Sequence, residues 1–273
     1  WEMENEIRPL MPMIYYHVWD NYPYPTFNKQ FYESNDLVAT ISKVTDDIVK
    51  TVAPEVKSQY IPHAVNGDIF KPETNDDLIE EFKKSMFGDF YNPDKFVFFW
   101  NNRNARRKQS GSLIFWFKEF LDKVGHDKAT LVMHTEVKDP NGQDLEAIIH
   151  HLGLTDGQVL FSQQKVDLRK LSLMYSIADC TINIADAEGF GLATLESLSC
   201  GTPIIVNMTG GLQEQVIEDG KEFGIPLYPA SRAIIGSQEI PWIYEDRLNG
   251  DQVIEAMDRI IIFKTLIKHG LIL

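Results

Sequence analysis

Apolar and polar residues succeed one another along most of the chain in a pattern that predicts strands followed by helices. From residue 95 onward, short continuous apolar runs alternate with amphipathic stretches of helical spacing. Continuous apolar strands between such helices are typical of a parallel sheet that is covered on both faces. The expected strands are residues 95–100, 129–135, 159–162, 180–185 and 203–207, and the expected helices are residues 112–124, 144–152, 167–178, 191–199 and 212–218. The pattern therefore predicts a doubly wound α/β domain of ordinary size.

A smaller α/β part is expected ahead of this domain. Residues 13–18, 37–41 and 60–65 have the apolar patterns of strands. Residues 45–51 begin a helix, for which Ser42 or Thr45 is the expected cap. Three strands with few helices bury little apolar area. We therefore expect either that this first domain is incomplete in the sequence or that it is a compact subdomain lying on the larger one.

The turn-rich segment NGDIFKPE at residues 66–73 predicts the joint between the two parts. We expect an N-terminal domain at residues 1–66 and a C-terminal domain at residues 67–250, both Rossmann-like. Residues 229–251 carry Pro, Gly and Ser and are expected to be a loop insertion. Residues 251–273 are expected to contain a final helix that crosses back to the N-terminal domain.

Composition and charge exclude several classes of function. The 273 residues include 40 acidic side chains against 26 Lys and Arg, which gives a net charge of −14. Such a chain is a poor general binder of nucleic acid or anionic membranes, so a phosphate site must be built locally. The two cysteines, Cys180 and Cys200, exclude a disulfide framework and favour a reducing, cytoplasmic compartment. No apolar run reaches the roughly 18 residues of a membrane span, so no transmembrane segment is expected.

The segment AEGFGLATLESLSCG at residues 187–201 carries the most chemistry. A strand is expected to end just before it and a helix to begin near Gly191. Gly189 and Gly191 allow the backbone to approach a ligand closely, and the helix N-terminus offers N–H groups to a phosphate. The carboxylates of Glu188 and Glu196 would repel phosphate, so we expect them to accept hydrogen bonds from hydroxyl groups. The segment therefore predicts a pocket for a sugar nucleotide.

Two other interpretations of this segment remain open. GFGLAT could be a degenerate dinucleotide fingerprint, which would make the protein an NAD-dependent oxidoreductase. Against this, Thr194 stands where the fingerprint has a small residue, and the next strand ends in Asn207 rather than in an acid for the ribose. The two glutamates could also be a helix cap and a solvated helix face. A protein that binds sugar nucleotides without transferring the sugar is a further alternative.

Seven residues separate Glu188 from Glu196, and Ser-Cys-Gly-Thr-Pro and a strand follow. This arrangement resembles the Glu-x7-Glu signature of retaining GT-B glycosyltransferases of the group 1, family 4-like type. Four further segments resemble blocks of the same family, namely residues 60–72, 159–166, 171–179 and 207–215. The resemblance extends over about residues 13–220. It implies two Rossmann-like domains that face a cleft, with the nucleotide sugar bound by the C-terminal one.

The resemblance also implies roles for charged residues. Arg103 and Lys108, in the segment NRNARRK, match the two cations that bind the donor diphosphate. Their chemistry agrees with this role, although the segment could instead be a solvated basic cluster. Glu188 matches the acid that faces the donor sugar, and Glu196 matches the acid that binds the ribose hydroxyls. His17 matches a histidine that reaches toward the donor sugar, while a lone histidine among aromatic residues is more often part of a core.

Backbone contacts with the donor follow from the same resemblance. They involve Gly189, Phe190, Gly191 and Leu192, with Thr194 at the helix start and Gln164 and Lys165 beside the base. The resemblance implies transfer of a sugar from a nucleoside diphosphate sugar to an acceptor with its anomeric configuration retained. No metal or other cofactor is expected, because Arg103 and Lys108 supply the positive charge and no convincing Asp-x-Asp motif is present. The acceptor, whether saccharide, lipid-linked or protein, is not indicated.

Overall fold

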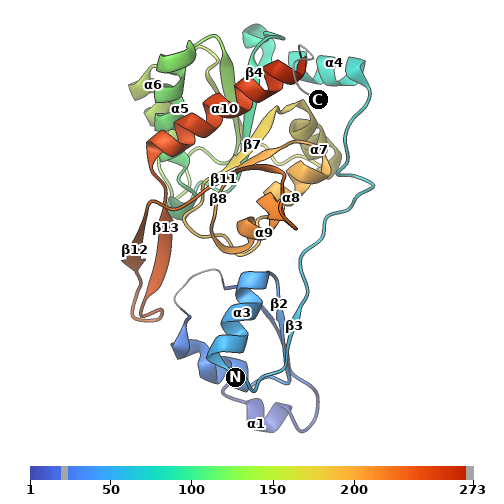
Figure 1. Ribbon diagram of the computed structural model, residues 1–273, viewed down its shortest axis with the longest axis vertical. Helices are drawn as coiled ribbons and strands as arrows, with labels where there is room; N and C mark the ends of the chain where they lie inside the picture. The colour runs from blue at the N-terminus through green and yellow to red at the C-terminus, as the bar shows by residue number, and fades with distance from the viewer. Residues whose placement is uncertain (20–23, 269–273) are drawn as a thin grey trace.

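The computed structural model describes residues 1–19 and 24–268, which form two α/β parts joined by an extended segment (Figure 1). The N-terminal part has a parallel sheet in the order β1-β2-β3. Its elements are α1 (Glu4–Ile7), β1 (Ile14–His17), η1 (Thr26–Asn28), α2 (Lys29–Glu33), β2 (Leu37–Thr40), α3 (Lys43–Val52) and β3 (Ser58–Tyr60). Ser42 caps α3, because its side chain accepts a hydrogen bond from the Thr45 backbone N–H at 3.1 Å.

The larger part contains a six-stranded sheet whose neighbouring strands all pair in parallel. Its strands are β4 (Phe96–Asn101), β5 (Ala129–His134), β6 (Val159–Ser162), β7 (Cys180–Asn183), β8 (Ile204–Asn207) and β11 (Gly224–Leu227). They lie in the order β11-β8-β7-β4-β5-β6. The chain winds outward from β4 in one direction and then from β7 in the other, so the order reverses between these two strands. Ligands of such sheets bind beyond the carboxyl ends of the strands at this switch point.

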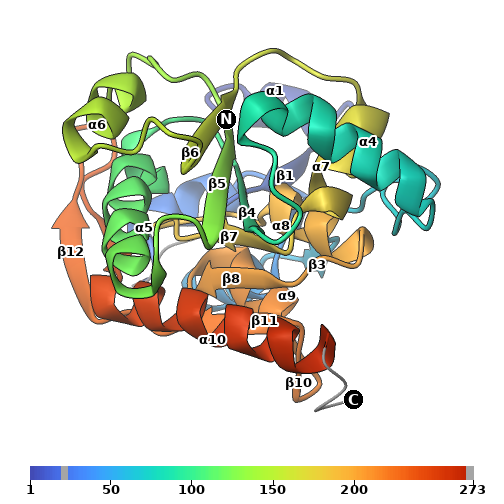
Figure 2. The ribbon, with the colours of Figure 1, turned by 90° about the horizontal axis from the view of Figure 1, so that it is seen from above.

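Helices cover both faces of this sheet (Figure 2). They are α4 (Asp76–Phe87), α5 (Ser110–Val124), α6 (Leu145–Leu152), α7 (Leu168–Ile177), α8 (Leu192–Ser199), α9 (Gln213–Val216) and α10 (Gly250–Lys268), with the short turns η2 (Gly88–Phe90), η3 (Arg106–Lys108) and η4 (Gly210–Leu212). Successive side chains of β4 point to opposite faces of the sheet. Phe98 packs with α5 and α10, whereas Phe99 packs with α7. Burial on both faces explains the continuous apolar runs of the strands.

The α/β fold class expected from the sequence is confirmed, and most expected strands and helices are present within a few residues. Three local expectations are wrong. The third N-terminal strand ends at Tyr60, and residues 61–66 continue without regular structure. The expected helix at 212–218 is shorter, because β9 (Ile217–Glu218) turns back to pair with β10 (Lys221–Glu222). The expected loop at 229–251 contains an antiparallel hairpin of β12 (Ser231–Ile235) and β13 (Ile243–Arg247).

The final helix, α10, lies along the larger domain over its described length (Figures 1 and 2). Val253, Met257 and Ile260 are buried in the same core cluster as the inner face of α5. The described part of the helix therefore does not cross to the N-terminal domain, because its apolar stripe is already used within the larger domain. The rest of the expected segment, residues 269–273, lies outside the described residues. No helix between residues 1–19 or 24–268 combines the length and the apolar character needed to span a membrane.

Side chains on α9 and in the β12–β13 hairpin contact the N-terminal domain. The carboxylate of Glu214, at the start of α9, accepts a hydrogen bond from the Lys43 backbone N–H at 2.7 Å and another from the Tyr60 hydroxyl at 2.7 Å. Because Lys43 is the first residue of α3, Glu214 supplies a negative charge to the N-terminus of a helix in the other domain. The hairpin contact is aromatic, with the rings of Phe27 and Trp242 at 5.1 Å.

Replacing Glu214 with alanine is expected to lower the free energy of unfolding by about 1–2 kcal/mol, because a helix N-terminus and a hydroxyl both lose their acceptor. Denaturant unfolding followed by tryptophan fluorescence measures this change. The matched control is Glu222→Ala on β10, whose side chain is exposed. Equal stability of the two variants would contradict a stabilising role for Glu214.

Candidate functional site

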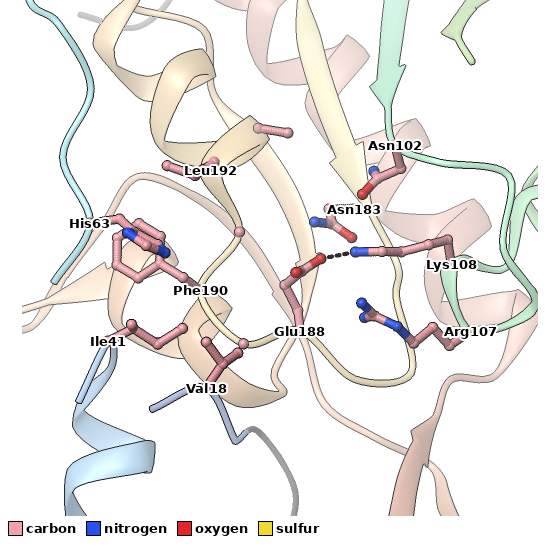
Figure 3. A pocket seen from close by; sticks show the side chains of 13 residues that line it. Val18, Ile41, His63, Asn102, Arg107, Lys108, Asn183, Glu188, Phe190 and Leu192 are labelled. Carbon is pink, nitrogen blue, oxygen red and sulfur yellow. Dashed lines mark hydrogen bonds and ion pairs between the residues drawn. The ribbon is translucent and has the colours of Figure 1, made fainter. Parts of the chain in front are cut away.

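A cavity of about 330 Å³ lies at the switch point, between the loops that follow β4 and β7 and the N-terminal domain (Figure 3). It is lined by Val18, Ile41, His63, Asn102, Arg107, Lys108, Asn183, Glu188, Gly189, Phe190, Gly191, Leu192 and Ala193. Six of the residues singled out from the sequence therefore meet here, on two loops that are about 80 positions apart in the chain. We call this cavity the inner pocket.

An ion pair joins the two loops across the inner pocket. The Lys108 ammonium contacts the Glu188 carboxylate, and the two side chains are only 9% and 13% exposed (Figure 3). Lys108 belongs to η3. Glu188 belongs to the loop after β7, and its backbone carbonyl accepts a hydrogen bond from the Gly211 N–H at 3.0 Å. An anionic ligand at this place would compete with Glu188 for the ammonium group, and the freed carboxylate would be available to accept from hydroxyl groups.

A second cation, Arg107, also lines the inner pocket, and its guanidinium donates to the Ala187 carbonyl (Figure 3). The sequence analysis placed Arg107 only within a basic cluster. Its position directly before Lys108 was the available signal, because both belong to the same short turn after β4. The inner pocket therefore holds two positive side chains in a chain that is acidic overall.

The N-terminus of α8 points into the inner pocket. Gly191 precedes this helix with a φ of 90°, and a Cβ at this position would lie 2.5 Å from the Leu212 side chain, so only glycine fits. Leu192 and Ala193, the first two helical residues, line the cavity. Their backbone N–H groups are among those that an α-helix cannot satisfy internally, which makes this end suitable for an anion.

Two asparagine amides complete the polar wall of the inner pocket. The Nδ2 atoms of Asn102 and Asn183 are buried and have no hydrogen-bond partner within the described part of the chain. Both residues line the cavity. Buried donors are normally satisfied, so two unpaired amides in the wall of one cavity favour a ligand that carries acceptor oxygens, toward which these side chains would have to turn.

A second cavity of about 430 Å³, the outer pocket, continues from the first, and Asn102 lines both. The outer pocket is lined by Asn101, Asn102, Arg103, His134, Thr135, Glu136, Asp139, Ser162, Gln163, Gln164 and Lys165. Gln164 and Lys165 thus lie at the carboxyl end of β6, where the sequence analysis expected a base. The two cavities are neighbours at the carboxyl edge of the sheet, and together we call them the groove.

Arg103 lies in the outer pocket and not beside Lys108. Its guanidinium forms a two-pronged ion pair with Asp139, at 2.6 Å and 3.2 Å, and this pairing lowers the pKa of Asp139 to about 2. The side chain remains 64% exposed. The expectation that Arg103 and Lys108 share one cavity is therefore corrected. Arg103 pairs with Asp139 in the outer pocket, whereas Lys108 lines the inner pocket.

Glu196 and Thr194 line neither the inner nor the outer pocket. The Glu196 carboxylate accepts from the Tyr175 hydroxyl at 2.7 Å, and Tyr175 in turn accepts from the Asn101 amide at 2.8 Å, which connects Glu196 to the outer pocket. Burial raises the pKa of Glu196. The Thr194 hydroxyl is fully buried and lies 2.7 Å from the Gly191 carbonyl, so it supports the loop from behind.

His17 is not brought to the groove. It is 1% exposed, its Nε2 lies 2.8 Å from the Tyr32 hydroxyl, and burial lowers its pKa to about 4. Successive side chains of an extended chain point to opposite sides, so Val18 faces the inner pocket and His17 does not. The histidine that lines the inner pocket is His63, whose ring contacts Phe190 at 5.2 Å. It lies within residues 60–72, one of the segments that resemble blocks of the family, and was not expected to be a site residue.

Within residues 1–19 and 24–268, no cluster of three or more His, Cys, Asp or Glu side chains could hold a metal ion. The site lies at the switch point of a doubly wound α/β sheet and holds cationic side chains and a helix N-terminus. Residues 82–234 match the model of the family described as "Glycosyl transferases group 1". The chain therefore belongs to this family.

Two curated relatives show the extent of the similarity. A D-inositol 3-phosphate glycosyltransferase of Xylanimonas cellulosilytica is 34% identical over 77 residues, which are 28% of this chain and 18% of that protein. A sucrose synthase of Denitrovibrio acetiphilus is 29% identical over 165 residues, covering 56% of this chain and 20% of that protein. The aligned parts thus span about a fifth of either relative.

Solved structures share the fold over most of this chain. The sucrose-phosphate synthase of Thermosynechococcus elongatus superposes with a TM-score of 0.66 at 22% identity, covering 86% of this chain and 51% of that one. Anabaena HepE, in complex with UDP and glucose, gives a TM-score of 0.61 at 18% identity, covering 80% and 58%. The chain spans roughly half the length of these structures, and its fold is of the same GT-B type.

Proposed function

We propose that this chain binds a nucleoside diphosphate sugar along the groove and transfers the sugar to an acceptor with its anomeric configuration retained. The observation that carries this proposal is the composition of the inner pocket, where two cations, two asparagine side chains and a helix N-terminus lie around one cavity at the switch point. These groups suit a diphosphate, whereas the Glu188 carboxylate suits the hydroxyls of a sugar.

The outer pocket is the proposed place of the base and ribose. Gln164 and Lys165 lie at its far end, and Asn102 lies between them and Lys108. The diphosphate would then lie against Lys108, Arg107 and the start of α8. The sugar would lie beside Glu188 and the backbone of residues 189–192. HepE, a structural relative, has been seen with UDP-glucose, which makes uridine compounds the first candidates.

In the proposed reaction, the bond between the anomeric carbon and the terminal phosphate oxygen breaks, and its electron pair stays with the nucleoside diphosphate. Lys108, Arg107 and the α8 N-terminus stabilise the negative charge that develops there. The acceptor hydroxyl attacks the same face of the sugar and gives its proton to the leaving phosphate, which retains the configuration. We propose that no metal ion is required, because the side-chain cations supply the positive charge. Catalysis then consists mainly of positioning and charge stabilisation.

The experiment that tests this function is a thermal-shift panel of UDP, GDP, ADP and NAD, followed by the sugar derivatives of the protective nucleotide. We expect a nucleoside diphosphate at 100 times its Kd to stabilise the fold by about 2.7 kcal/mol and NAD to have no effect. Saccharide, lipid-linked and peptide acceptors are then assayed by NMR, with and without EDTA. A retained anomeric configuration in the presence of EDTA is the expected result. Protection by NAD alone, an inverted product or a loss of activity in EDTA would each contradict part of the proposal.

A further inference from the structure

The β12–β13 hairpin ends in a group of charged side chains beneath the inner pocket. Glu245, on β13, is only 2% exposed, and its carboxylate accepts from Arg106 at 2.9 Å and from Arg247 at 2.6 Å. Arg106 belongs to η3, the same turn that carries Lys108. A charge buried this deeply is costly unless it is paired, so the hairpin and η3 hold each other in place.

Asp186 connects this group to the loop that carries Glu188. Its side chain is 2% exposed, accepts from the Gln109 amide at 2.5 Å and forms an ion pair with Arg247 at 3.2 Å. Its backbone N–H donates to the Arg107 carbonyl at 2.8 Å, and its carbonyl accepts from the Asp246 N–H at 2.9 Å. One residue is thus bonded both to the turn after β4 and to the hairpin.

We propose that Arg247 and Glu245 are positioning residues of the donor site, acting through Asp186. This inference rests on the proposed function. Asp186 precedes Glu188 by two residues and bonds to the backbone directly before Lys108. No hairpin residue lines the inner pocket. The hairpin therefore acts on the Lys108–Glu188 pair indirectly, through the bonds of Asp186 and Arg106, and displacement of this network would move both charged groups.

The charge of Asp186 controls this network. Burial raises the pKa of Asp186 to about 6, Gln109, Arg247 and Arg106 act to lower it, and Glu245 acts to raise it. A cavity of about 180 Å³ beside Asp186 and Arg247, lined also by Trp116, gives the side chains room to separate. When pH falls below about 6, Asp186 becomes neutral and its ion pair with Arg247 is lost. We therefore expect kcat to fall with decreasing pH around this value.

Two substitutions should shift the midpoint of this fall in kcat at low pH, the acid limb of the pH profile, in opposite directions. Arg247→Gln removes a cation and raises the pKa of Asp186, so the midpoint of the limb moves up by about one pH unit. Glu245→Gln removes a like charge and moves the midpoint down by a similar amount. The assay is release of UDP from UDP-glucose across pH 4.5–8.5. At pH 6.5, a midpoint that moves from about 6 to about 7 lowers the kcat of Arg247→Gln about threefold.

The matched control is Arg232→Gln. Arg232 forms an ion pair with Asp246 at 2.7 Å on the same hairpin, but its side chain is 53% exposed. Its pH profile should equal that of the unchanged protein. Unchanged midpoints in Arg247→Gln and Glu245→Gln, or midpoints that move in the same direction, would overturn the inference.

Amide hydrogen exchange provides a measurement that does not depend on turnover. At pH 7.5, peptides covering residues 184–191 should exchange faster in Arg247→Gln than in Arg232→Gln, because the loop loses its buried ion pair. Equal exchange in the two variants would also overturn the inference. A chain that shows no turnover of any sugar nucleotide but does show this difference in exchange would contradict the proposed function alone.

Discussion

Alanine at position 108 is expected to lower kcat for sugar transfer by about 10²–10³-fold. The Lys108 ammonium is 9% exposed, faces the cavity from η3 and is held there by Glu188. A cation that is already in place when charge develops on a leaving diphosphate needs no reorganisation, which is why its removal should act mainly on the transition state. Loss of the ammonium also leaves the Glu188 carboxylate without its partner, so the inner pocket would repel the diphosphate.

Steady-state kinetics with the donor found by the nucleotide panel measure this loss. Lys118→Ala is the matched control, because Lys118 lies on the neighbouring helix α5 and pairs with Asp122 near the surface. Lys108→Arg should recover only part of the activity, since a guanidinium differs from an ammonium in shape and hydration. If Lys108→Ala retained more than a tenth of the activity, the leaving-group role would be wrong.

Glutamine at position 188 should separate binding from transfer. The substitution keeps the size of the side chain but removes its charge, which abolishes the ion pair with Lys108. We expect UDP to bind as tightly as before or more tightly, because a carboxylate no longer competes for the ammonium. We expect kcat to fall by about 10²-fold, because hydrogen bonds from sugar hydroxyls to a charged acceptor are stronger than those to an amide.

Calorimetric titration with UDP and transfer assays on the same preparation test this separation. Glu119→Gln on α5 serves as the control, because that side chain is exposed and belongs to the same domain. A parallel loss of UDP affinity and kcat in Glu188→Gln would show that Glu188 supports the pocket only as a structural partner of Lys108.

The strands β4, β5, β7 and β8 of the larger domain were predictable because they are buried on both faces, whereas the half-buried β11 was not expected from the sequence. Residues 159–162 match β6 exactly in extent, and β4 and β8 differ by one residue from the expected bounds. The β12–β13 hairpin was not predictable in this way. Its strands are largely exposed or half-buried, so their side chains carry no continuous apolar run. What holds the hairpin is a group of charged side chains, whose pairing depends on residues more than 100 positions away.

The sequence was sufficient to predict which loops form the site. Lys108 and Glu188 meet because the carboxyl ends of β4 and β7 are neighbours, which the strand order determines. The direction of a single side chain was less predictable. Arg103 pairs with Asp139, 36 positions away, and His17 turns into the N-terminal core. Asn102 and Asn183 were missed because an asparagine at a strand end is common, and only the structure shows that their amides are unsatisfied.

A crystal structure of this chain with UDP tests the central claim most directly. We predict diphosphate oxygens within hydrogen-bond distance of the Lys108 ammonium and of the backbone N–H groups of Leu192 and Ala193, with the uracil in the outer pocket beside Gln164. The Lys108–Glu188 ion pair should be broken in that complex. A diphosphate bound beyond the reach of Lys108, with the ion pair intact, would contradict the account.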